Sequence, residues 1–250
     1  MIDWLRRGND GTEAKRDAED HVIEIAGQVL PVVLTRRHQA KRITLRIADD
    51  ASHIRISLPH WTRASEALDF ANSRKDWIAS ALAKIPRRAA PEAGGSIEFR
   101  GQQLVVDWRP DARRKPALGE DRLIIGGPSE NLIPRLQRWL EGEAQRLATS
   151  DLAEYCGIAD IAEVPQLRIS RARRRWGSCA ADGTVRINWR LIQAPDHVRR
   201  SVVAHEVAHL VHFDHSPAFH AFFARIFEGD GKAADRWLKA HGRGLYSAFG

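Results

Sequence analysis

The segment that most constrains this chain is His205-Glu206-Val207-Ala208-His209, inside the apolar stretch that runs from Ser201 to Val211. Two residues four positions apart lie about one helical turn apart, so a helix brings both imidazoles to one face. There they can reach a single tetrahedral metal ion, while Glu206 stands beside the open coordination position. The segment therefore predicts a helix over residues 196–213 that carries a metal site.

A third ligand has to come from outside this helix, because a catalytic zinc ion takes three protein ligands and one water. His215 lies six residues after His209, just before Ser216 and Pro217. Ser216 can cap a following helix with Pro217 as its first residue. Such a turn can return the imidazole of His215 to the metal, so His215 is the candidate third ligand.

Other residues near this helix are weaker candidates. The six-residue step matches the metzincin pattern, but His212 stands at its glycine and Met1 is the only methionine, so a metzincin is not expected. We expect the side chain of His212 to lie in solvent or next to the metal ligands without binding the metal, and His220 to have a structural role. Cys179 is expected to be a buried thiol and not a nucleophile, because no base accompanies it.

The composition excludes several classes of protein. The 250 residues are 43% hydrophobic and 28% charged, which is ordinary for a globular chain and not for a collagen-like or disordered one. Cys156 and Cys179 form no C-x-x-C pair, which argues against a disulfide scaffold or a cysteine-built zinc site. No stretch approaches the roughly 18 apolar residues of a membrane span, and the first residues lack the apolar core of a signal peptide. We expect a soluble, cytoplasmic protein.

The positive charge is concentrated in one segment. The net charge is +7, and residues 166–200 hold nine arginines against Asp182 and Asp196. The arginines of Arg171 to Arg175 predict a nucleic acid or nucleotide partner, or an anionic substrate beside the metal. The alternative is a cationic loop that packs under the helix, with Trp176 and Trp189 in the core. A peptide substrate is expected to lie along the strand at 184–189.

Short β-branched runs and helical periodicity predict an α+β fold, with a small antiparallel sheet region and no internal repeat. Residues 1–20 are polar and aperiodic, so we expect a flexible N-terminal tail. Strands are expected at 23–34, 42–47, 53–58, 97–99, 104–108, 123–125, 166–170 and 184–189, with a hairpin turn at Asp49-Asp50. Helices are expected at 65–85, 132–155 and 196–213, with one or two more at the C-terminal end.

Four segments together resemble the YgjP-like metal-dependent hydrolases, which are relatives of the SprT-like and WLM zincin metallopeptidases. They are Arg175-Trp176-Gly177-Ser178-Cys179, Ile187-Asn188-Trp189-Arg190-Leu191, the H-E-V-A-H segment and Asp214-His215-Ser216-Pro217-Ala218-Phe219. The segment Lys75-Asp76-Trp77-Ile78 is similar to that family as well. Asp214 replaces an expected Asn and His220 an expected Trp, which bears on substrate preference more than on metal binding.

The resemblance implies a zincin-like catalytic core over 161–250, preceded by an accessory strand and helix region over 21–160. It implies Zn²⁺ as cofactor, His205, His209 and His215 as its ligands, and Glu206 as the catalytic carboxylate. The leading hypothesis is a zinc-dependent metallopeptidase that uses a metal-activated water with Glu206 as general base.

Two alternatives stay open. One is a metal-dependent phosphohydrolase that acts on nucleotides and holds their phosphates with the Arg171–Arg175 region. The other is a DNA-associated protein with structural zinc. A structural zinc ion is normally closed by four protein ligands, whereas three histidines leave a position open, which favours an enzyme.

Overall fold

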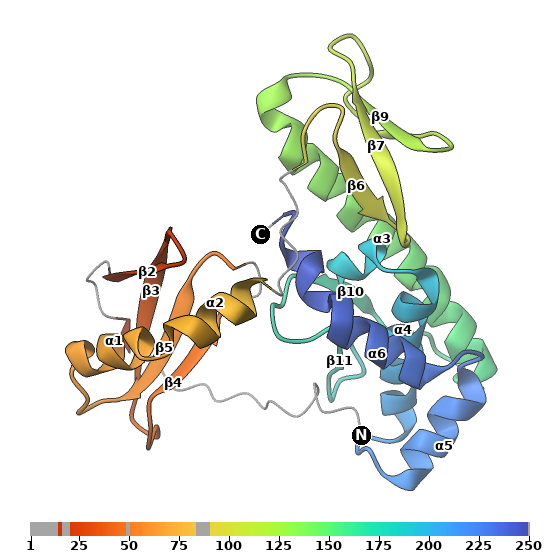
Figure 1. Ribbon diagram of the computed structural model, residues 1–250. Helices are drawn as coiled ribbons and strands as arrows, with labels where there is room; N and C mark the ends of the chain where they lie inside the picture. Colours follow the sequence, from red (N-terminus) through yellow and green to blue (C-terminus); the bar gives the residue numbers. More distant parts are fainter. Residues whose placement is uncertain (1–14, 17–20, 49–50, 84–90, 250) are drawn as a thin grey trace. The chain divides into compact units, whose positions relative to one another are not determined.

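The computed structural model describes residues 15–16, 21–48, 51–83 and 91–249 (Figure 1). The chain divides into two compact units, here called the N-terminal unit, which ends at residue 88, and the C-terminal unit, residues 89–249. The expected tail lies outside the described residues except for Lys15–Arg16, which form β1 and pair with β3. The expected hairpin turn at 49–50 also lies outside them. None of the helices in the described ranges combines the length and apolar content needed to cross a membrane.

The N-terminal unit is a mixed sheet packed against two short helices. Its elements are β2 (His21–Ile25), β3 (Gln28–Arg37), β4 (Thr44–Ile47), β5 (Ile54–Pro59), α1 (Ala64–Asn72) and α2 (Lys75–Ala83). The strand expected at 23–34 is divided by a turn at Ala26 and Gly27, which both have positive φ angles. Alternating residues of the central strand β5, among them Ile54 and Ile56, are fully buried with Ile78 of α2. This burial matches the period of two in the sequence.

The helix expected at 65–85 is two helices. The chain leaves the first helix at Ser73, whose hydroxyl donates to the carbonyl of Phe70 at 2.8 Å. A serine hydroxyl that bonds to a nearby carbonyl competes with the helical backbone, which accounts for the break without a proline.

The C-terminal unit contains two sheets and the longest helix. The second sheet consists of β6 (Ser96–Phe99), β7 (Gln102–Trp108), β8 (Ala117–Leu118) and β9 (Arg122–Ile125), and the third of β10 (Leu167–Ser170), β11 (Gly177–Cys179) and β12 (Val185–Asn188). The helices are η2 (Ser129–Asn131), α3 (Leu132–Ile158), η3 (Trp189–Gln193), α4 (Asp196–Val211), α5 (Pro217–Ile226), α6 (Gly231–His241) and η4 (Gly242–Tyr246). These mixed elements confirm the expected α+β class.

Helix α3 connects the second sheet to the rest of the C-terminal unit. Leu136 and Leu140 pack with β6, β7 and β9, whereas Leu152 and Tyr155 pack with α4. Residues 89–160 therefore share one compact unit with the H-E-x-x-H helix. The expected boundary at residue 160 stays a prediction.

All three sheets repeat one strand order that is not visible in the sequence. In each, three consecutive strands lie side by side in the order first, third, second, which gives β3-β5-β4, β7-β9-β8 and β10-β12-β11. In chain order, the first and third strands of each set pair in parallel, and the other strand pairs are antiparallel. The chain that joins the first strand of each set to the edge strand, here called the crossover segment, spans residues 38–43, 109–116 and 171–176.

Candidate metal centre

Helix α4 carries its polar residues inside the molecule. It packs against α3, α5, α6 and β11, and its residues from Ser201 to His209 are all buried. His205 is 2% exposed, Glu206 is fully buried and His209 is 9% exposed. A helix that is buried on nearly all sides normally carries apolar residues. Three ionisable residues on it therefore indicate a site.

The structure brings His205, His209 and His215 together. The Nε2 atom of His205 lies 3.1 Å from that of His209 and 3.2 Å from that of His215. The ligand atoms of the three residues all lie within 4.8 Å of one another. Nitrogen ligands 2.0–2.1 Å from a tetrahedral zinc ion are about 3.3 Å apart, so the two shorter separations fit such an ion.

The buried imidazoles are held in the neutral form that metal binding requires. Burial, together with the neighbouring histidines, keeps the pKa of His205 far below its usual value, and burial also lowers that of His209. The carbonyl of His212 lies 3.0 Å from Nδ1 of His209, where it accepts a hydrogen bond and leaves the Nε2 lone pair for the site. His212 thus contributes its backbone to the site.

The turn before α5 positions the third histidine as expected. Ser216 is the N-cap residue, its hydroxyl accepts from the amide of Phe219 at 3.4 Å, and Pro217 is the first helical residue. Phe219 is fully buried, and its ring lies 4.6–4.9 Å from the rings of all three histidines. The sequence did not single out Phe219 as part of the site, although it lies in the first turn of α5, four residues after His215.

Glu206 is confined by Gly177 of β11. A Cβ atom on Gly177 would lie 2.3 Å from Oε1 and 2.8 Å from Cγ of Glu206, so only glycine allows this approach. Burial raises the pKa of Glu206 to about 8, although the Cys179 amide and the charge of Arg175 act in the opposite direction. Neither carboxylate oxygen has a partner within hydrogen-bond geometry in the described part of the chain. A buried carboxylate without a partner is what a site for a cation or a reacting water requires.

The cysteine and tryptophans of this region have structural positions. Cys179 is half-buried, and burial together with the nearby charge of Glu206 raises the pKa of its thiol to about 11, so it is not a nucleophile at neutral pH. Trp189 is fully buried in the core. Trp176 is partly buried and packs against the ring of Tyr246. His220 is exposed on α5, and its ring centroid lies 6.4 Å from that of His215.

The expectation that a peptide lies along residues 184–189 is wrong. Within that segment β12 is the central strand of its sheet, with β10 on one side and β11 on the other. A strand that is paired on both sides has no free backbone groups for a further strand. The edge strand beside Glu206 is β11.

Several arginines of the 166–200 segment are structural. Arg199 pairs with buried Asp151 at 2.7 Å, and Arg171 pairs with Glu141 at 2.8 Å. Arg190 is buried, with its guanidinium 4.8 Å from the ring centroid of Trp189 and 4.7 Å from that of Tyr246. The high arginine content therefore partly reflects internal packing and ion pairs.

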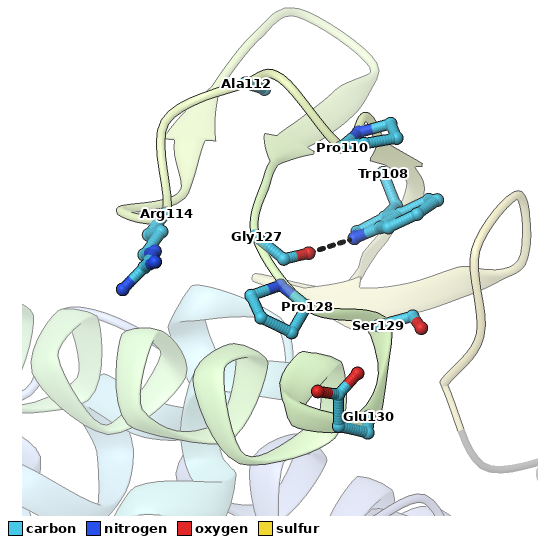
Figure 2. A pocket seen from close by; sticks show the side chains of 8 residues that line it. All are labelled: Trp108, Pro110, Ala112, Arg114, Gly127, Pro128, Ser129 and Glu130. Carbon is cyan, nitrogen blue, oxygen red and sulfur yellow. Dashed lines mark hydrogen bonds between the residues drawn. The ribbon is translucent and has the colours of Figure 1, made fainter.

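Of two cavities in the C-terminal unit, one is lined by a histidine of the metal site and the other is not. A cavity of about 20 Å³ lies behind His205 and is also lined by Asp235, whose Oδ2 pairs with Lys239 at 2.7 Å. A larger pocket of about 500 Å³ lies between the end of β7 and the start of α3, where the Trp108 indole donates to the Gly127 carbonyl at 2.9 Å (Figure 2). The larger pocket contains none of the metal-site residues.

Comparisons with known proteins address the same region. A family model described as "YgjP-like, metallopeptidase domain" matches residues 41–241. None of the curated proteins matches the sequence. Among solved structures, the chain is similar to the metallopeptidase zymogen of Pyrococcus abyssi abylysin, at 20% identity and a TM-score of 0.34, over 37% of this chain and 92% of that one. The family match includes all three histidines, Glu206 and Gly177.

Proposed function

Because the chain belongs to the YgjP-like metallopeptidase family, we propose that it is a zinc-dependent peptidase whose metal is held by His205, His209 and His215 and whose general base is Glu206. Membership of the family makes the chain a metal-dependent hydrolase with a peptide or protein substrate. The identity of the ion, its ligands and the role of Glu206 are the parts that we propose. The observation that carries them is the convergence of three imidazoles beside one confined carboxylate.

The donor set supports zinc. Three imidazole nitrogens suit a zinc ion, and three protein ligands leave one coordination position open. When bound, zinc supplies Lewis acidity that polarises a substrate carbonyl. The ring of Phe219 holds the three imidazoles in place, and the His212 carbonyl fixes the orientation of His209.

Glu206 moves the proton in this proposal. Burial raises its pKa, so its carboxylate is a stronger base than that of an exposed glutamate. It takes a proton from the attacking water and delivers the proton to the leaving amine. Gly177 prevents the carboxylate from turning away, because the backbone of β11 closes that side.

Strand β11 supports a peptide substrate. It pairs with β12 along one side and with no other strand of the described chain. An extended peptide can add to such an edge by main-chain hydrogen bonds, which would place its carbonyls beside α4. The short length of β11, Gly177–Cys179, limits this pairing to a few residues.

The other two hypotheses have less support. The comparisons offer nothing for a nucleic acid or nucleotide at Arg171–Arg175, and Arg171 is already paired with Glu141. Nucleotide hydrolysis there stays a prediction that the same experiment can test. A structural zinc is disfavoured, because the cluster provides three ligands and a nearby carboxylate.

The test compares zinc content and hydrolysis in the wild type and Glu206→Gln, with a mixed peptide library and a nucleoside triphosphate panel as substrates. Glu163→Gln, at an exposed loop position, is the matched control. We expect one zinc per chain in all three proteins and peptide cleavage in all but Glu206→Gln. Phosphate release that Glu206→Gln abolishes would support the phosphohydrolase instead. Peptide cleavage that persists in Glu206→Gln would contradict the role of Glu206.

A further inference from the structure

The three crossover segments carry a large share of the basic residues. Residues 109–116 and 171–176 each contain four arginines or lysines, and residues 38–43 contain Lys41 and Arg42 directly after Arg36 and Arg37 of β3. Together the three segments contain one acidic residue, Asp111. Their combined positive charge exceeds the net charge of +7 of the whole chain. The chain thus places basic residues at the same topological position three times.

The first crossover segment passes the end of β5, where aromatic residues gather. Arg37 at the end of β3 lies opposite Pro59, and Thr44 at the start of β4 lies opposite Ser57. Both ends of the segment therefore flank the last residues of β5, and His60 and Trp61 follow directly.

Three aromatic rings form a continuous exposed group at this end. The ring of His38 stacks on that of His60 with centroids 5.0 Å apart and an interplanar angle of 29°. The ring of His60 meets that of Trp61 edge to face at 4.8 Å. Trp61 is 63% exposed, although large apolar rings are normally covered.

The basic residues at the end of β3 and in the crossover segment are available for a ligand. Arg37, Lys41 and Arg42 are exposed and make no ion pair with a residue of the described chain. No acidic residue occurs in 36–46 or 57–65. Arg36 is different, because its guanidinium donates to the carbonyls of His60 and Thr62 at 3.2 and 2.5 Å and so fixes the aromatic turn.

We propose that Arg37, His38, Lys41, Arg42, His60 and Trp61, here called the basic aromatic patch, bind single-stranded nucleic acid. Exposed rings provide surfaces on which unpaired bases stack, and the surrounding cations neutralise the phosphates. An acidic peptide would use the cations, but its carboxylate side chains have no aromatic face to stack on the rings. The patch lies in the N-terminal unit, whereas the metal site lies in the C-terminal unit.

The other two crossover segments lack this combination. In the second, Arg109 pairs with Asp107 at 2.6 Å, and the neighbouring Trp108 is only partly exposed and donates to Gly127. In the third, Trp176 packs against Tyr246. The second segment therefore provides a basic control without an exposed indole.

The experiment measures the fluorescence anisotropy of labelled oligothymidine and oligouridine of about 20 nucleotides with the full chain. We expect the wild type to bind both, with a logarithmic salt slope of about −2 for three phosphate contacts. The variant Arg37→Glu/Arg42→Glu should lose binding, whereas Arg113→Glu/Arg114→Glu removes the same charge and should change it by less than about threefold.

A second pair of variants tests the rings. Trp61→Ala should weaken binding by at least about fivefold with an unchanged salt slope, and Trp61→Phe should largely restore it. Trp77→Ala, at an exposed position of α2 in the same unit, should have little effect. Equal losses in both charge-reversal variants, an unaffected Trp61→Ala, or binding of poly-glutamate as tight as that of the oligonucleotides would overturn the proposal.

Discussion

Gly177→Ala tests whether β11 positions the carboxylate of Glu206. The added Cβ would lie 2.3 Å from Oε1, 2.8 Å from Cγ and 2.9 Å from Cδ of Glu206. Real Cβ contacts essentially never fall below 3.0 Å, so the carboxylate or the strand has to move by at least about 0.7 Å. Glu206 is fully buried, so its carboxylate cannot move out into solvent without a shift of the surrounding residues.

The structure allows the size of the effect to be estimated. A displacement of about 1 Å of a reacting group can reduce turnover by about 100-fold. Overpacking of a buried site lowers the free energy of unfolding by about 1–3 kcal/mol. The three atoms nearest to the added methyl group all belong to Glu206 and none to a histidine, so zinc content should remain one per chain.

The assay combines peptide turnover, zinc content and urea denaturation. Gly142→Ala is the control, because it adds the same methyl group on an exposed face of α3 with no atom within 4 Å. Combining Gly177→Ala with Glu206→Ala should recover stability, since the clashing atoms are removed. Wild-type turnover in Gly177→Ala, or loss of its zinc, would refute the reasoning.

Three further predictions concern stability. In the metal-free protein the pKa of Glu206 is raised from 4.5 to about 8, so between these pH values the folded state keeps a proton that the unfolded state releases. The free energy of unfolding therefore falls as the pH rises from 4.5 to about 8. Calorimetry of chelated samples should show that Glu206→Gln removes most of this fall in stability. If the wild type and Glu206→Gln have the same pH dependence, the carboxylate of Glu206 does not have the raised pKa and the prediction is wrong. Arg199→Met leaves Asp151, 6% exposed, without its closest partner and should cost about 3–5 kcal/mol in urea denaturation, whereas Arg236→Ala at an exposed pair should cost less than about 1 kcal/mol. Ser216→Ala removes the α5 cap and should cost about 1 kcal/mol, with weaker zinc binding in a competition titration; unchanged zinc affinity would show that the cap does not position the site.

The parts of the site that could be predicted from the sequence are local. The i, i+4 spacing of His205 and His209 and the cap at Ser216 are decided by neighbouring residues, and the structure reproduces both. The contact between Gly177 and Glu206 depends on how β11 packs on α4, which no local pattern encodes. Phe219 could have been selected from its position in the first turn of α5, directly after the segment that carries His215.

The strands could be predicted more readily than their pairing. A period of two locates a strand but does not reveal its neighbours, so the central position of β12 and the three parallel pairs were not foreseen. The crossover segments decide the strand order, and their sequences only indicate loops. The break at Ser73 was missed because a serine inside an apolar periodic stretch is compatible with a continuous helix.

The most direct test of the metal site is the zinc stoichiometry of His215→Gln beside His220→Gln. Both histidines are exposed and lie five residues apart, but only His215 has its Nε2 atom 3.2 Å from that of His205. We predict one zinc per chain in the wild type and His220→Gln, and a clear loss in His215→Gln after dialysis against a weak chelator. Full zinc retention in His215→Gln, at wild-type affinity, would contradict the proposed ligand set.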